Sequence, residues 1–156
     1  MTYAAETSVS VDRSRNELER TLQRYGADAF GYASRAGEAV VEFTTHARHV
    51  RFTVLLPDRG EKRFVLTSQG RKRSPAASME AWEQACRQRW RALNLVVKAK
   101  LEAVEAGIST IEEEFLAHTV LPNGRTVWEE TRDVIAKAYE LGTFDGAGLL
   151  RIGSGK

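Results

Sequence analysis

The longest uninterrupted helical pattern in the chain, residues 75–106, constrains the fold most. Ser74-Pro75 supplies an N-cap followed by proline at the first helical position, and the next helix breaker is Gly107. About 32 residues of helix extend roughly 48 Å at the standard rise. One arc of this helix is apolar and comprises Met79, Trp82, Cys86, Trp90, Leu93, Val97, Leu101 and Val104. Such a helix outreaches a small sheet, so we expect one end to pack on neighbouring elements or on another subunit, and the protein to form a homo-oligomer.

Residues 38–56 indicate a β-hairpin. A two-residue turn at His46-Ala47 places Thr45 opposite Arg48, and the later pairs follow by counting. One face then carries only apolar pairs, namely Phe43 with Val50, Val41 with Phe52 and Ala39 with Val54. The other face pairs Glu42 with Arg51 and Val40 with Thr53. A slip of one residue would disrupt every pair, so the pattern fixes the register. Because His-Ala is not a preferred turn pair, a longer loop is the alternative.

The flanking segments complete an α+β fold. Alternation at Phe30 and Tyr32, and at Phe64 and Leu66, predicts further outer strands, and Val9 with Val11 allows one more before the first helix. Three capping boxes predict the remaining helices, at Ser14-x-x-Glu17, Ser109-x-x-Glu112 and Thr126-x-x-Glu129. The last helix should turn Trp128, Thr131, Ile135 and Tyr139 inward and end at Gly142.

We therefore predict a short antiparallel sheet of three to four strands, a β-meander, packed against the long amphipathic helix. A short N-terminal helix and two C-terminal helices complete a single domain over residues 1–142. The glycine-rich tail, residues 143–156, is expected to be weakly ordered.

Composition excludes several classes of protein. The chain has 156 residues, of which 42% are hydrophobic and 28% charged, as in globular domains. Its single cysteine precludes an intramolecular disulfide or a thiolate metal cluster. The N-terminus lacks the apolar core of a signal peptide, and no segment approaches the ~18 apolar residues of a membrane span. We expect a cytoplasmic protein without membrane contact.

No residue pattern predicts catalysis, a metal site or a cofactor. His46 and His49 lie beside a turn, where side chains diverge, and His118 fits a packing or helix-end role. Cys86 lies between two tryptophans in the apolar arc and is interpreted as a small buried hydrophobic residue. The acids at 112–114 suit the first turn of a helix better than acid/base chemistry. A small enzyme stays a minor alternative, since no nucleophile and base can be paired.

Charge is distributed unevenly along the chain. Residues 44–100 hold 13 basic and 4 acidic side chains, a net charge of +9, whereas the overall net charge is +2. Either this segment meets phosphates or an acidic partner, or it is neutralised by the acidic flanks within the fold.

Particular basic residues are candidates for binding phosphate. Arg89 and Lys100 border the apolar arc of the long helix and have no acidic residue four positions away. They either extend along apolar surface or form a cationic wall beside aromatic rings. Arg59 could continue that wall. The complete predicted nucleic-acid-binding set is Arg48, Arg51, Lys62, Arg63, Arg71, Lys72, Arg73, Arg89 and Lys100.

Most of the chain resembles a family of small uncharacterised proteins of tailed phages and prophages. The resemblance rests on residues 87–107, on IEEEFLAHTVLPNGRTVWE, on TSVSVDRSRNELERTLQRYGA and on RHVRFTVLLPD. It implies a phage or host-takeover setting, and so the host cell cytoplasm, but no activity or functional residue.

The sequence thus favours a non-enzymatic, phage-type nucleic-acid-binding protein acting in DNA replication or recombination. Single-stranded DNA is preferred to duplex as the partner, because arginines alternate with aromatic residues. The alternative is a host-takeover or anti-defence protein that binds a host protein or a small phosphorylated ligand.

Overall fold

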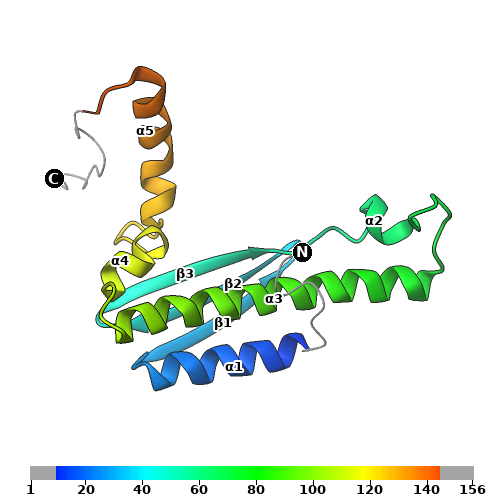
Figure 1. Ribbon diagram of the computed structural model, residues 1–156, viewed down its shortest axis with the longest axis horizontal. Helices are drawn as coiled ribbons and strands as arrows, with labels where there is room; N and C mark the ends of the chain where they lie inside the picture. Colours follow the sequence, from blue (N-terminus) through cyan, green and yellow to red (C-terminus); the bar gives the residue numbers. More distant parts are fainter. Residues whose placement is uncertain (1–9, 145–156) are drawn as a thin grey trace.

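The computed structural model describes residues 10–144 and has two layers, a sheet and a pair of helices (Figure 1). The elements in order are α1 (Val11–Arg24), β1 (Ala29–Arg35), β2 (Glu38–Thr45), β3 (Arg48–Leu55), α2 (Lys62–Val65), α3 (Pro75–Glu105), α4 (Ile111–Phe115), the 3-10 helix η1 (Leu116–His118) and α5 (Val127–Leu141). The strands form one antiparallel sheet in the order β1-β2-β3. The predicted α+β meander with a long helix is confirmed.

The core lies between one face of the sheet and the helices α1 and α3. The sheet contributes alternate residues of β2 and β3, and the helices contribute one apolar arc each. The core residues are Leu18, Leu22, Ala39, Val41, Phe43, Val50, Phe52, Val54, Trp90, Leu93, Val97, Leu101, Ile111 and Phe115. The opposite face of the sheet is not covered by a helix of the described chain (Figure 1).

The β2–β3 hairpin has the predicted register. Thr45 pairs with Arg48, Phe43 with Val50, and the remaining pairs follow to Glu38 opposite Leu55. The turn contains two residues, His46 at φ 49° and Ala47 at φ 57°. Two left-handed residues make the tight hairpin turn that suits strand twist, and neither residue adopts that region readily. The apolar cross-strand pairs therefore impose the turn.

One predicted strand is absent from the described structure, and one predicted helix start is wrong. Phe64 and Leu66 do not form an outer strand: Phe64 is buried in the short helix α2, and Leu66 makes only an isolated bridge with Lys72. The first helix begins at Val11, one turn before the predicted start, because the Ser10 side chain accepts the Arg13 N–H. Val11 is thus helical, whereas Val9 lies outside the described residues.

The long helix begins at Pro75 as predicted and ends at Glu105, one residue before the predicted end, and its overhang is covered within the chain. The Ser74 side chain accepts the Ala77 N–H at the helix start. The amino-terminal end of α3 extends past the sheet and packs on α2 (Figure 1). There Phe64 is 3% exposed, and the Trp82 indole N–H donates to the Pro57 carbonyl at 2.8 Å. Packing on neighbouring elements, one of the two predicted outcomes, thus accounts for this end.

The C-terminal helices differ from the prediction in what they bury. The capping box of α4 is Thr110 with Glu113, one residue beyond the predicted pair. The box at Thr126 and Glu129 and the left-handed Gly142 bound α5 as predicted. Of the four residues predicted to face inward on α5, Thr131 is buried as predicted, whereas the prediction is wrong for Trp128, Ile135 and Tyr139, which are exposed.

The hairpin turn provides a test of the register argument. Replacing both turn residues (His46→Asn with Ala47→Gly) supplies the pair that this turn prefers, so we expect the free energy of unfolding to rise by about 1 kcal/mol. Urea denaturation measures the change. Ala33→Gly in β1 is the control and should be destabilising, because glycine in a strand weakens it. A destabilised turn variant would contradict the assigned turn.

Candidate nucleic-acid interface

The structure divides the nine predicted binding residues among separate places. Five of them lie around α2 and the start of α3, because the segment after α2 folds back on it: the Arg73 N–H donates to the Val65 carbonyl, and the Arg73 side chain to the Leu66 carbonyl. We call this group the basic tip; it comprises Lys62, Arg63, Arg71, Lys72 and Arg73. Nearby, the Arg59 guanidinium lies 4.2 Å from the centre of the Trp82 ring.

Arg48 and Arg51 lie elsewhere, on β3. Arg51 is engaged on the uncovered face of the sheet: its side chain donates to Glu42 at 2.5 Å and to the Gly124 carbonyl at 2.8 Å. The same guanidinium is the main reason why the pKa of Glu42 is lowered, with a smaller effect from His49 at 3.2 Å. Arg51 therefore ties the hairpin to the turn before α5. Arg48 is exposed at the hairpin end.

Arg89 and Lys100 have different environments, although they border the same arc. Lys100 donates to the Glu114 carbonyl at 2.8 Å and to its carboxylate at 3.2 Å. Hydrogen bonds from Ser109 and Lys100 lower the pKa of Glu114. Lys100 thus joins α3 to α4. Its partner Glu114 is 14 residues away in the sequence, so looking for acidic residues four positions from Lys100 does not find it. Arg89 is exposed and forms no ion pair with any residue in 10–144.

This difference predicts that the two residues respond differently to substitution. Lys100→Gln leaves the half-buried Glu114 without its cation, so the free energy of unfolding should fall by about 1 kcal/mol. Arg89→Gln should stay within about 0.5 kcal/mol of the wild type, as exposed sites usually do. Chemical denaturation of the two single variants measures both. Equal losses would mean that Lys100 does not hold α4.

His118 lies in the same corner and has a packing role, as predicted. Its ring stacks on Phe52 with 3.9 Å between the centres and is half-buried. Burial, followed by repulsion from Lys100, lowers the pKa of His118, and a hydrogen bond with the Arg51 backbone opposes them. The neutral ring is therefore the form that the fold accommodates.

The lowered pKa predicts that acid destabilises the fold. Below about pH 6.5 an unfolded histidine takes up a proton, whereas folded His118 does so only at lower pH. The unfolded state then binds more protons, and the free energy of unfolding falls as the pH drops through this window. His118→Phe should flatten that part of the profile, measured by urea unfolding at several pH values. An unchanged slope in His118→Phe would contradict the assignment.

The tryptophans of α3 do not offer free faces for base stacking. Trp90 is 3% exposed, and the Tyr32 ring meets it edge-on at 5.5 Å. Trp82 is partly buried beneath Arg59, and its indole N–H donates a hydrogen bond to the Pro57 carbonyl. The alternation of arginine and aromatic residues along α3 reflects core packing, with the arginines at its border.

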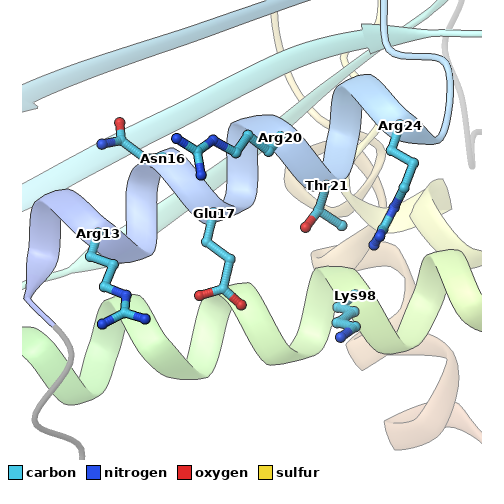
Figure 2. A pocket seen from close by; sticks show the side chains of 7 residues that line it. All are labelled: Arg13, Asn16, Glu17, Arg20, Thr21, Arg24 and Lys98. Carbon is cyan, nitrogen blue, oxygen red and sulfur yellow. The ribbon is translucent and has the colours of Figure 1, made fainter.

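A basic groove lies between α1 and α3, on the side away from the sheet. Its volume is about 640 Å³, and its lining residues are Arg13, Asn16, Glu17, Arg20, Thr21, Arg24 and Lys98. Figure 2 shows Arg13, Glu17 and Arg24 reaching from α1 toward α3, where Lys98 projects from the facing helix. We call this feature the α1–α3 groove. From Arg13 to Arg24 it extends about 16 Å along α1 at the standard helical rise.

The groove is cationic, because its one carboxylate is already paired. Glu17 accepts from Arg91 of α3 at 3.0 Å. Arg13, Arg20, Arg24 and Lys98 are exposed and form no ion pair with residues 10–144, although Arg24 lies 5.4 Å from the Tyr25 ring centre. At one end Tyr25 donates to Glu102 at 2.5 Å, which raises the pKa of Tyr25 to about 12 and links the two helices.

The sequence prediction missed this groove, although its signal is present. Residues 13, 20 and 24 are arginines at spacings of seven and four, which places them on one side of a helix. They were overlooked because residues 1–43 carry more acids than bases, so the segment total concealed a basic helix face.

Neither a metal-ligand group nor a membrane-spanning helix is found in the described part of the chain. In residues 10–144 no group of three or more His, Cys, Asp and Glu side chains could hold a metal ion. None of the helices described there combines the length and hydropathy needed to cross a membrane. Cys86 is buried, as predicted, and burial raises the pKa of its thiol.

Comparisons with protein families, curated proteins and solved structures find no match to this chain. The fold and the groove therefore have to support the functional argument by themselves.

Proposed function

We propose that this protein binds the phosphate backbone of nucleic acid, single-stranded DNA in preference to duplex, and that the α1–α3 groove is the binding surface. The observation that carries the proposal is four exposed cations without acidic partners in the described chain, gathered along one groove from two helices. Phosphate contacts of this kind supply most of the affinity of proteins that bind nucleic acid without sequence preference.

The shape of the groove favours a single strand. Packed helices lie about 8–10 Å apart, so the furrow between them receives one phosphodiester chain rather than a duplex. The helix that stands clear of the body, α5, has four acids, Glu129, Glu130, Asp133 and Glu140, against two bases, Arg132 and Lys137, and its net negative charge opposes entry into a DNA groove. With both α3 tryptophans packed, binding depends on phosphates more than on stacked bases.

The basic tip and Arg89 are proposed as additional phosphate contacts outside the groove. The tip adds five cations near the amino-terminal end of α3, of which Arg63 is paired with Glu61 at 2.6 Å. In this proposal the groove is the primary site, and the tip contacts a longer strand. In the phage setting that the sequence resemblance implies, the protein would act as a homo-oligomer in replication or recombination, in the host cell cytoplasm.

The second candidate is an interaction protein that captures a host protein or a small phosphorylated ligand. A groove of about 640 Å³ could also hold a small phosphorylated molecule. The exposed apolar residues of α5 are the observation that favours contact with a protein.

Salt dependence tests the primary proposal. Four phosphate contacts predict that the logarithm of affinity for a labelled oligo-dT falls with log salt at a slope of about −3. Arg13→Gln with Arg24→Gln should halve that slope and lower affinity by about 1–3 kcal/mol. Glu17→Gln releases Arg91 and should raise affinity. Fluorescence anisotropy measures all three proteins.

The control variant, Arg35→Gln with Lys137→Gln, also loses two positive charges, but these lie outside the groove and the basic tip. It should bind the oligonucleotide as the wild type does. If both double variants weaken binding equally, only a diffuse basic field exists. If a mononucleotide binds as tightly as the oligonucleotide, the result favours the second candidate function, capture of a small phosphorylated ligand. Failure of every oligonucleotide to bind at low salt would end the proposal.

A further inference from the structure

Helix α5 leaves the body of the protein after its first turn. In Figure 1 it rises away from the sheet and from α3, and its main contacts with another element of the described chain are with η1. Thr131 is its only buried residue. A 15-residue helix is marginal in water without packing, even with the capping box and the left-handed Gly142 that bound this one. We therefore expect packing against a partner to stabilise its outer turns.

One side of α5 carries exposed apolar side chains, with the charged Arg132 among them. Trp128 is 53% exposed, Tyr139 86%, and Phe144, just past the helix, 59%. Ile135 lies between the first two, and residues 128, 135 and 139 share one side of a helix. We call this surface the α5 ridge. Beside its outer part is a hollow of about 570 Å³, lined by Ile135, Ala138, Tyr139, Gly142, Thr143 and Phe144.

The exposed area is of the size that a dimer requires. The exposed fractions of the three aromatic side chains add up to about two whole side chains, or about 400 Å² in each copy. Two copies would bury about 800 Å² from these side chains alone, and Ile135 with the adjoining backbone brings the total near the ~1,000 Å² at which specific interfaces begin.

The ridge is self-complementary about Ile135. Trp128, its largest side chain, precedes Ile135 by seven residues, and Gly142, which lines the hollow, follows it by seven. Apart from its chain neighbours, no described residue lies within 4 Å of the place where a Cβ of Gly142 would be. A two-fold axis through Ile135 would set residue 128 of each copy opposite residue 142 of the other, in an isologous contact.

We propose that the α5 ridge is the surface through which two copies associate, with antiparallel α5 helices crossing at Ile135. Antiparallel helices also set opposite dipole ends beside each other. The inference specifies the surface for the proposed homo-oligomer and does not depend on nucleic acid, because the groove lies on α1 and α3. The net negative charge of α5 disfavours nucleic acid as the occupant of the ridge, and a second copy would cover its exposed aromatic side chains with the same apolar surface.

Site-specific crosslinking tests the proposed axis. Ile135→Cys places two thiols at the crossing point, so mild oxidation should give a disulfide-linked dimer of twice the 17.4 kDa chain mass. Ala136→Cys, exposed and turned about 100° around the helix, is the matched control and should give little. The wild type reports any background from Cys86, which is buried and has a raised pKa.

Light scattering without nucleic acid completes the test. The wild type should give a dimer mass at micromolar concentration, Ile135→Arg a monomer mass, and Ala136→Arg a dimer mass, with circular dichroism showing that all three are folded. A folded wild type that stays monomeric overturns the proposal. So does a dimer that Ile135→Arg leaves intact, since association would then use another surface. The binding of a short oligonucleotide is measured separately, so either proposal can fail without the other.

Discussion

The parallel packing of α1 beside α3 on the apolar face of the sheet is the contact on which the rest of the structure depends. It buries Leu18 and Leu22 against Trp90, Leu93 and Val97 and closes the core over β2 and β3. The same contact creates the groove, because a furrow remains where two helices lie side by side and their outward residues here are basic. The ties from Glu17 to Arg91 and from Tyr25 to Glu102 hold the helices in that arrangement. The packing of α1 beside α3 therefore produces both the core and the candidate site.

This packing also explains which parts of the fold could be predicted. The hairpin register followed from the sequence because Phe43, Val41 and Ala39 each have one apolar partner at a fixed count from the turn. The long helix followed from Ser74-Pro75 and the apolar arc. What failed depends on distant contacts. Asn94 is a polar residue of α3 that is buried without a hydrogen bond to the described residues, which its local sequence does not indicate. The apolar pattern of Phe64 and Leu66 could not distinguish a strand from a single helical turn that seals the end of α3.

The candidate site was less predictable than the fold, for the same reason. A charge total over a segment does not say which cations find partners in space: Lys100 and Arg51 meet Glu114 and Glu42, whereas Arg13 and Arg24 remain unpaired with the described residues. An amphipathic pattern does not say what covers it either. The periodicity that identified α5 was correct, yet its apolar side faces away from the core. Basic groove and apolar ridge thus lie on different elements, which allows strand binding and self-association to coexist.

A map of backbone amide shifts during titration with an unlabelled oligo-dT tests whether the α1–α3 groove binds a single strand. We predict shifts concentrated on α1 and on the stretch of α3 from Arg91 to Glu102, reversed by added salt, with α5 unaffected. Weaker shifts at the basic tip would fit its accessory role. Shifts confined to the uncovered face of the sheet or to α5, or no shifts at low salt, would contradict the assignment of the α1–α3 groove.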